Sequence, residues 1–549
     1  MTVAAPPVRH LVDLVPGELR RSWAATGRYR DRDLYSLFHQ QVTAHPARAA
    51  VVDADGTTGY GELDAVVRCL AVGLAGLGVE QGDVVAVQLP NGRLACAFDL
   101  AVAALGAVVL PYPVGRGDRE AWSLLSRSGA VAAVTATAHG DYPCAERTRA
   151  LAGDLPQLRT VVAVGDGPTP AGCVPLAALL RADPTRFVPA LPDPDGPARI
   201  LVTSGSEAEP KMVLYSHNAL VGGRGRFIGA LVGDVPVLRN FVMVPLASSY
   251  GSNGTSVTLA VHGGTLVLMP GFSAEAALAM IGSARPTHVL AVPTMFRMIA
   301  DHPALARYDT TSLRVVALGG AALDATTAAR VRDALGCAVV NVYGSADGVN
   351  CHTAIDDPPH RADTAGRPNP DVARIRIVDD ELREVPRGEV GEITSLGPMT
   401  PMCYVGAPEL DARYRLPGGG VRTGDLGRVD DDGYLHVVGR RKDVVIRGGL
   451  NISPAEVEGL LATHPSVRDV VCVPVPDPVL GERLCACVVA DRDLALAELT
   501  GHLADRGLEP RKFPERVVRF GELPLGPAGK VDRRAVQAVA AARAGGLSP

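Results

Sequence analysis

Hydrophobic runs of strand length alternate with longer amphipathic segments up to about residue 370 of the chain. Residues 34–49 and the run GYGELDAVVRCLAVGLAGLGV have the spacing of amphipathic helices, and the second run ends at a glycine. Short apolar runs between such segments include DVVAVQLPN, ARILVTS, THVLAVP and LRVVALGG. Apolar strands that alternate with helices are typical of parallel sheets with both faces covered. The number of units predicts an α/β fold with two helix-covered sheets.

The pattern changes after about residue 370. RIRIVDDELREVPRGEVGEIT and GVRTGDLGRVDDDGYLHVVGR alternate apolar and polar positions, which predicts an antiparallel β-rich subdomain with DDDG as a hairpin turn. Ser453 then precedes a helical run as a predicted N-cap, with Glu456 three residues later. We therefore predict a large N-terminal core over residues 1–441 and a small, mobile α+β domain over residues 442–549, divided in the charged turn GRRKD.

Composition narrows the class of protein. A chain of 549 residues is long enough for two to four domains or subdomains. The net charge of −5 and the lack of a basic block argue against nucleic-acid binding. The ten cysteines are scattered without a CxxC pair, which favours reduced thiols in a cytoplasmic protein over structural zinc. No signal peptide or membrane span is predicted, so no membrane partner is expected.

The loop TSGSEAEPK, residues 203–211, follows the apolar run ARILV and ends in a lysine. Thr203, Ser204, Gly205 and Ser206 offer hydroxyls and backbone N–H groups to phosphate oxygens, and Lys211 adds a positive charge. The loop is not a Walker motif, since GxxxxGK[ST] is absent. Taken alone, the loop is better explained as a strand-to-loop turn that binds no ligand.

Four further motifs follow in one order at long spacings: NVYGSADG, RTGDLG, GRRKDVVIRGGLNISPAEVE and PLGPAGKVDRR. Together the five motifs resemble those of the acyl-adenylate-forming (ANL) enzymes, and the resemblance extends from about residue 35 to 540. VPLASSYG, GCAVVNVYGSADGVNCHTAIDDPP and DRGLEPRKFPERV are most similar to stand-alone aryl-acid AMP ligases. The resemblance implies ATP-dependent activation of an aromatic carboxylic acid to an acyl-AMP, with release of pyrophosphate.

The resemblance also implies roles at the nucleotide. Lys530 would carry an ammonium to the carboxylate and the phosphates, a contact that stabilises charge in the transition state. Asp425 would accept hydrogen bonds from the ribose diol, as a carboxylate does in dinucleotide folds. Arg440 would contact the ribose or a phosphate, and Tyr343 and the small residue Gly320 would lie beside adenine. Ser345 and Ala346 would line the acyl and phosphate region. Asp347 would bind Mg²⁺.

This chain departs from the family pattern at several positions, Ala208 among them. Asp347 and Ala346 stand where most relatives have glutamate and a hydroxyl residue, so metal contact through water is expected from the shorter Asp347. Glu207 interrupts the usual hydroxyl- and glycine-rich loop. We expect Glu207 and Glu209 to face solvent while the backbone and hydroxyls of the loop face the phosphates.

The acid would lie against a segment that resembles the His-Asn-Tyr segment of aryl-acid ligases. Ser248, Ser249 and Tyr250 are its residues here, and Ser249 replaces the asparagine that meets a 2-hydroxyl group. A serine offers a donor and an acceptor and leaves more room. Salicylate-like, anthranilate-like and other substituted benzoates therefore stay open. Further residues expected in the pocket wall are Gly254, Gly319, Val342 and Cys351, and His217 is either near the site or a core or capping residue.

The family's second half-reaction transfers the acyl group to a thiol. The resemblance places a hinge at Lys442 and implies that Gly448 and Gly449 line a thiol tunnel after the C-terminal domain rotates. The thiol is expected in trans, from the phosphopantetheine of an aryl carrier protein or from CoA. An acyl-CoA ligase is thus one alternative, and a catalytically inactive ligand-binding protein of the same fold is another.

Overall fold

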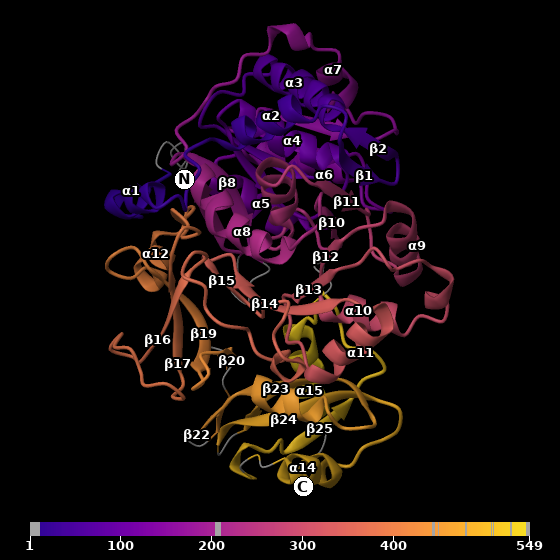
Figure 1. The fold of residues 1–549 in the computed structure, drawn as a ribbon, viewed down its shortest axis with the longest axis vertical. Coiled ribbons are helices and arrows are strands. Elements are labelled where there is room, and N and C mark those ends of the chain that lie inside the picture. The colour runs from indigo at the N-terminus through magenta and orange to yellow at the C-terminus, as the bar shows by residue number, and fades with distance from the viewer. Residues whose placement is uncertain are drawn as a thin grey trace.

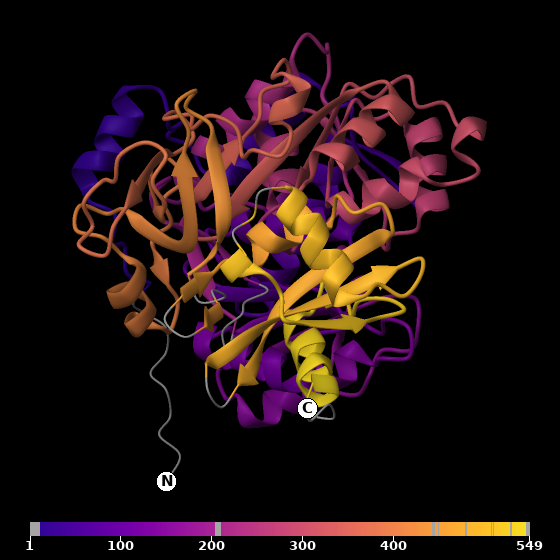
Figure 2. The ribbon, with the colours of Figure 1, turned by 90° about the horizontal axis from the view of Figure 1, so that it is seen from below.

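The computed structural model describes residues 11–203, 210–441, 445–447, 450–477, 480–506, 508, 510–526 and 530–544. Four β-sheets organise these ranges (Figure 1). Two large sheets with their helices form the N-terminal part, a smaller sheet adjoins them, and the fourth belongs to the C-terminal unit. Figure 2 shows that the C-terminal unit lies across the junction of the other parts.

The first eight-stranded sheet has the order β18-β9-β8-β4-β3-β5-β6-β7. Its strands β3 to β8 run parallel, while β9 and β18 are antiparallel additions at one edge. In β3 every residue is buried, with Val85 and Val87 in one core and Val84 and Ala86 in another. Both faces are therefore covered, as predicted from the continuous apolar runs. The strands are β3 (Val84–Gln88), β4 (Val108–Pro111), β5 (Ala132–Ala136), β6 (Thr160–Val164), β7 (Val174–Pro175), β8 (Pro197–Val202), β9 (Met212–Ser216) and β18 (Cys403–Tyr404).

The second eight-stranded sheet has the order β15-β14-β13-β12-β10-β11-β1-β2. Its central strands are parallel, and the hairpin partners β2 and β15 close its edges in antiparallel pairing. One apolar core takes side chains from both large sheets, including Val87 of β3 and Val242 of β10. The strands are β1 (Ala49–Asp53), β2 (Gly56–Gly59), β10 (Arg239–Val242), β11 (Thr265–Leu268), β12 (His288–Ala291), β13 (Val315–Gly319), β14 (Ala338–Ser345) and β15 (Val349–His352).

Helices cover these sheets and fill the space between them (Figure 1). They are α1 (Gly17–Ala25), α2 (Leu34–Ala44), α3 (Tyr60–Gly76), α4 (Arg93–Ala104), α5 (Asp118–Ser128), α6 (Cys144–Leu151), α7 (Leu176–Leu180), α8 (His217–Val232), α9 (Ala274–Ala284), α10 (Pro293–Ala300) and α11 (Ala325–Leu335), with a π-helical segment η4 (Gly254–Val261). Helix α2 is shorter than the predicted 34–49, because the chain turns at His45–Pro46 and β1 begins at Ala49. A helix rarely continues to the residue before a proline.

The β-rich subdomain contains an antiparallel sheet in the order β16-β17-β19-β20 and helix α12. Its elements are β16 (Arg374–Val378), β17 (Gly391–Leu396), α12 (Pro408–Tyr414), β19 (Val421–Val429) and β20 (Leu435–Arg440). The predicted antiparallel pattern after residue 370 is therefore confirmed.

The C-terminal unit is a small α+β structure, again as predicted. Its sheet has the order β22-β21-β24-β23, with β25 pairing to β24. Ser453 caps α13, because its hydroxyl accepts a hydrogen bond from the Glu456 N–H at 3.3 Å. The elements are β21 (Val445–Arg447), β22 (Leu450–Ile452), α13 (Pro454–Leu461), β23 (Val467–Asp477), β24 (Gly481–Ala490), α14 (Leu496–Asp505), β25 (Arg516–Arg519) and α15 (Arg533–Ala544). The boundary between residues 441 and 442 stays a prediction, since residues 442–444 lie outside the described ranges.

Two absences apply to the described ranges. Within them, no helix combines the length and the apolar composition that a membrane span requires. The same ranges contain no cluster of three or more His, Cys, Asp or Glu side chains arranged to hold a metal ion.

Candidate active site

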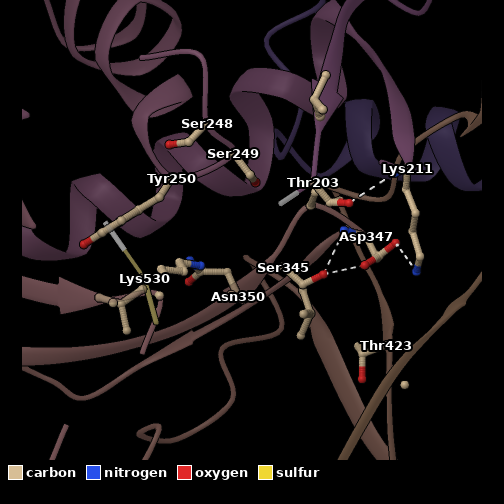
Figure 3. Close-up of a pocket in the computed structure, with 18 of the residues that line it drawn as sticks. Thr203, Lys211, Ser248, Ser249, Tyr250, Ser345, Asp347, Asn350, Thr423 and Lys530 are labelled. Atoms are coloured by element: carbon tan, nitrogen blue, oxygen red, sulfur yellow. Dashed lines mark hydrogen bonds and ion pairs between the residues drawn. The ribbon is translucent and has the colours of Figure 1, made fainter. Parts of the chain in front are cut away.

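A cavity of about 630 Å³ opens where the two large sheets, the β-rich subdomain and the C-terminal unit meet. Its wall takes residues from the ends of β8, β13 and β14, from α8, from the segment before η4, and from β19 and β20. Ligand sites in α/β proteins form at the carboxyl ends of parallel strands, and β13 and β14 both end at this wall. Figure 3 shows how the side chains of this wall converge.

Lys530 enters this cavity from the C-terminal unit and lies against Gly320. A Cβ atom on Gly320 would stand 3.2 Å from Lys530 Cε and 3.4 Å from its Nζ. Gly320 also has a φ of +83°, so both its conformation and this contact favour glycine. Partial removal from water, together with the nearby Arg440 guanidinium, lowers the pKa of Lys530, although the residue keeps an exposed surface.

Asp347 follows β14 and is buried at the opposite side of the cavity from Tyr250 and Lys530 (Figure 3). Tyr404 Oη donates to its Oδ1 at 2.6 Å, and Ser345 Oγ donates to its Oδ2 at 2.6 Å. Lys211 Nζ lies 3.5 Å from Oδ1. The carboxylate is therefore fixed in place by neutral donors and one cation.

Lys211 and Thr203 bracket the predicted phosphate loop at the ends of β8 and β9. Thr203 N donates to Lys211 O at 3.0 Å, and Lys211 N donates to Thr203 Oγ1 at 3.3 Å. The Lys211 ammonium lies 3.8 Å from the Tyr414 ring centroid, in cation–π contact. Both residues line the cavity. Ser204, Gly205, Ser206, Glu207 and Glu209 lie outside the described residues, as do Lys442, Gly448 and Gly449, so the expectations for them stay predictions.

Asp425 is held by two partners at the edge of the cavity. Its Oδ2 accepts from Tyr343 Oη at 2.7 Å, and its Oδ1 pairs with Arg440 Nε at 3.1 Å. Burial raises the pKa of Asp425, while Arg440 and the Tyr343 hydroxyl oppose that change. Gly424 and Arg440 line the cavity beside this cluster, whereas Asp425 and Tyr343 are not among the lining residues.

The predicted acyl segment borders the cavity at Ser248, Ser249 and Tyr250. Tyr250 Oη donates to Ala317 O at 3.0 Å, and its ring comes close to Gly319, where a Cβ would stand 3.4 Å from Tyr250 Cε1. The Ser248 hydroxyl donates a hydrogen bond to Pro245 O at 2.7 Å. Gly319 and Val342 line the cavity as expected.

Three predicted neighbours of the site lie elsewhere. Gly254 backs onto the core, where a Cβ would stand 2.6 Å from Leu246 Cδ2. Cys351 is buried in the core under the β-rich subdomain and contacts Gly366 O. Neither is among the residues of the cavity wall, so their assignment to the acyl pocket stays a prediction without support from this geometry. His217 is a fully buried residue at the start of α8 that accepts from Leu34 N at 3.2 Å, which favours the core interpretation.

Several polar residues of the cavity wall were not indicated by the sequence motifs, among them Arg224, Asn253 and Asn350. Arg224 lies on α8 and is 4% exposed. In the sequence, Arg224 lies within the apolar and glycine-rich run LVGGRGRFIGALV. Arg226 lies in the same run, and the sequence pattern does not distinguish the two arginines. Only the fold shows that Arg224 faces inward and Arg226 outward.

Two family models match the chain. One is described as AMP-binding enzyme and covers residues 38–405, and the other as AMP-binding enzyme C-terminal domain and covers residues 456–530. The two matched ranges contain Lys211, Asp347 and Lys530.

Similar proteins extend over almost the whole chain. A salicyl-AMP ligase / salicyl-S-ArCP synthetase of Mycobacterium tuberculosis is 34% identical, with 95% of this chain and 93% of the relative covered. A 2-hydroxy-7-methoxy-5-methyl-1-naphthoate–CoA ligase of Streptomyces carzinostaticus is 32% identical, with 98% of both covered. Among solved structures, the amide bond synthetase McbA from Marinactinospora thermotolerans superposes with a TM-score of 0.79 at 31% identity, over 92% of this chain and 99% of McbA.

Proposed function

Because this chain belongs to the AMP-binding enzyme family, we propose that it uses ATP to activate an aromatic carboxylic acid and then transfers the acyl group to a thiol. The family matches confirm the expected adenylate-forming fold and an AMP ligase activity. The aromatic acid, the thiol and the residue roles below are our proposals.

The position of Lys530 carries this proposal. Its ammonium enters a cavity that has the Tyr250 segment at one end and Lys211 and Asp347 at the other. Adenylation brings a carboxylate against the α-phosphate of ATP, and two anions repel each other. Lys530 lies at the Tyr250 end of the cavity, where a cation can hold the reacting carboxylate and stabilise the charge that develops in the transition state.

The reaction then proceeds by direct substitution at phosphorus. An oxygen of the carboxylate attacks the α-phosphorus, the new O–P bond forms, and the bond to the β-phosphate oxygen breaks with release of pyrophosphate. Lys530 holds the carboxylate and α-phosphate oxygens, and Lys211 with Thr203 lies towards the departing phosphates. The chain itself needs no proton transfer in this step.

Asp347 is the residue that fits Mg²⁺. Magnesium is commonly held by one or two protein carboxylates together with water and substrate phosphates, so a single buried aspartate in the wall meets the requirement. When bound, the ion would neutralise phosphate charge. Ser345 and Tyr404 keep the carboxylate oriented towards that position.

The nucleoside would lie against the Asp425 cluster and the glycine pair 319–320. Asp425 is already fixed by Tyr343 and Arg440, so it can accept from ribose hydroxyls without first losing side-chain freedom. Gly320 leaves backbone exposed at a position that Lys530 also reaches.

The acceptor we propose is the phosphopantetheine thiol of a separate carrier protein, since the relative at 34% identity is named a salicyl-S-ArCP synthetase. The CoA ligase at 32% identity keeps CoA as the second candidate. The inactive alternative is disfavoured by the geometry, because Lys211, Asp347 and Lys530 all line one cavity.

The test of adenylation is ATP–pyrophosphate exchange with a panel of benzoates, anthranilates and amino acids. Strong exchange with an aromatic acid is expected, and Lys530→Ala should lower it by at least about a hundredfold. Lys512→Ala, which removes a lysine of the same domain that pairs with Glu456, should leave exchange unchanged. No exchange with any acid, despite nucleotide binding, would refute the proposed function.

The acceptor requires a separate measurement. The purified enzyme with its bound acyl-AMP is mixed with CoA or with a carrier protein bearing phosphopantetheine, and thioester formation is followed by mass spectrometry. Faster transfer to the carrier supports the proposal, and faster transfer to CoA supports the second candidate.

A further inference from the structure

Residues 243–247 connect β10 to the acyl segment, and three of them, Val244, Pro245 and Ala247, line the cavity. Because β10 ends before this stretch, the backbone groups of the buried residues Val244 and Leu246 need partners outside that strand. Two side chains from the first large sheet and its connections supply these partners. The shape of the cavity wall at this point therefore depends on residues that lie far away in the chain.

Asn91 supplies the first of these side chains from the loop between β3 and α4. Its Nδ2 donates to Val244 O at 2.9 Å, and its Oδ1 accepts from Leu246 N at 2.8 Å. An amide side chain has the same donor and acceptor groups as a peptide unit. Asn91 therefore pairs with this stretch as a neighbouring strand would, and it continues the sheet beyond the end of β10.

Arg199, on β8, holds the carbonyl group of the same leucine. Its Nη2 donates to Leu246 O at 2.8 Å, and its Nη1 lies 2.6 Å from Asp99 Oδ2 on α4. Arg199 is 1% exposed and Asp99 is 3% exposed, so this ion pair is removed from water and has little freedom to move. Both backbone polar groups of Leu246 are thus fixed by side chains from outside its own sheet.

A tight turn passes the position of this stretch on to the acyl segment. Ser248 N and Ser248 Oγ both donate to Pro245 O, at 2.9 and 2.7 Å. The chain folds back so closely that a Cβ atom on Gly251 would clash with Pro245 O. A displacement of Pro245 would therefore move Ser248 and Tyr250, and with them the end of the cavity where Lys530 lies (Figure 3).

We propose that Asn91 is a positioning residue for the acid: its amide, supported by Arg199, sets the distance between the acyl segment and Lys530. This inference rests on the proposed adenylation. Asn91 is not among the described residues that line the cavity, so it acts through the backbone and not by contact with the substrate. No sequence motif indicated Asn91, because its two partners lie 153 and 155 residues away.

The test is Asn91→Leu, which keeps nearly the same volume but has neither the donor nor the acceptor. ATP–pyrophosphate exchange is measured over a range of acid concentrations and of ATP concentrations. We expect KM for the preferred acid to rise about tenfold or more, since a small misplacement of a bound substrate is enough for such a loss. KM for ATP should change less than about threefold, because the nucleotide contacts are retained.

The change in KM for the acid separates positioning from a purely structural role. A variant that is only less stable contains less folded enzyme, which lowers the apparent kcat but leaves both KM values unchanged. A variant whose acyl segment is displaced binds the acid less well while it remains folded. The thermal midpoint of Asn91→Leu, measured beside the kinetics, shows that the assay temperature lies below unfolding.

Hydrogen–deuterium exchange measures the same positioning without catalysis. In Asn91→Leu, a peptide spanning residues 243–253 should exchange faster than in the wild type, because Leu246 N–H loses its acceptor. Peptides from β19, on the other side of the cavity, should exchange at the wild-type rate.

Two further variants complete the experiment. Asn91→Ser guards against a failure of Asn91→Leu to fold: its hydroxyl is too short to reach both backbone groups, so KM for the acid should again rise. Asn369→Leu is the matched control, because Asn369 is half-buried like Asn91 and its Oδ1 accepts from Asp371 N at 2.9 Å outside the cavity wall. This control should leave KM for the acid unchanged even where its thermal midpoint falls.

The outcomes are distinct. A KM for the acid that stays constant in both Asn91 variants would overturn the inference and leave the proposed function intact. So would an equal rise of the KM values for acid and ATP, or wild-type exchange of residues 243–253 in Asn91→Leu. A wild type that activates no acid would refute the proposed function itself, and with it the inference.

Discussion

Arg440 connects the two titrating residues on which the proposed adenylation depends. It pairs with Asp425 at 3.1 Å, and its charge contributes to the lowered pKa of Lys530. Lys530 must be protonated to act, so activity should fall as pH rises through its lowered pKa. Asp425 must be ionised to accept hydrogen bonds from ribose. Because its pKa is raised, acidification should reduce activity at a higher pH than it would with an ordinary aspartate.

Arg440→Gln should therefore shift both limbs of the pH profile to higher pH. Without the guanidinium, the pKa of Lys530 rises, and the pKa of Asp425 rises further because a stabilising charge is lost. The measurement is kcat/KM for pyrophosphate exchange between pH 5 and 10. Arg376→Gln, at an exposed pair with Glu384, is the control and should leave both limbs in place. Limbs that stay fixed in Arg440→Gln would contradict this account.

At the scale of elements, the turn between β14 and β15 orients the residues of the site. Gly348 directly follows Asp347, has a φ of +97°, and would place a Cβ 2.6 Å from Pro401 Cδ. Gly348→Ala combines a left-handed conformation with a clash, so the turn must shift and Asp347 with it.

We expect Gly348→Ala to lower both the thermal midpoint and the exchange activity. Gly336→Ala is the matched control: Gly336 also has a positive φ of +65°, but a Cβ there would meet open space at the end of α11. It should lose about 1 kcal/mol of stability without a change in activity. Equal activity in the two variants would show that the turn does not position Asp347.

The sequence predicted elements better than it predicted the cavity wall. The antiparallel subdomain and the Ser453 cap depend on short-range patterns, and both were found. Cys351 was assigned to the pocket by motif position, yet Val349 and Asn350 are the residues of β15 that line the cavity. Arg224 could not be identified because its partners Ser249 and Ser252 lie 25 and 28 residues away in the chain.

At the scale of the whole molecule, the described C-terminal unit contributes Lys530 to a cavity whose other lining residues precede the predicted hinge. Thiol transfer in this scheme requires that unit to rotate, and Lys442 is the predicted pivot. Lys442→Pro fixes φ at that position and should restrict rotation. Pyrophosphate exchange should be reduced less than about threefold, whereas acyl transfer to the carrier should fall at least tenfold.

The control for that variant is Lys442→Ala, which removes the charge but leaves the backbone free. It should support both half-reactions at nearly wild-type rates. A similar loss of transfer in Lys442→Ala would assign the effect to the lysine side chain, and full transfer in Lys442→Pro would exclude residue 442 as the pivot.

The contact between Lys530 and Gly320 has one more consequence, for the fate of the intermediate. In the proposed scheme, Lys530 lines the cavity in which the mixed anhydride forms, so the adenylate would be retained until the C-terminal unit withdraws. Retention in the cavity would shield the hydrolysable acyl-AMP from bulk water. In the same scheme, each ATP consumed would correspond to one movement of the C-terminal unit. When the acyl acceptor is scarce, the enzyme would stop after a single turnover and would consume little further ATP.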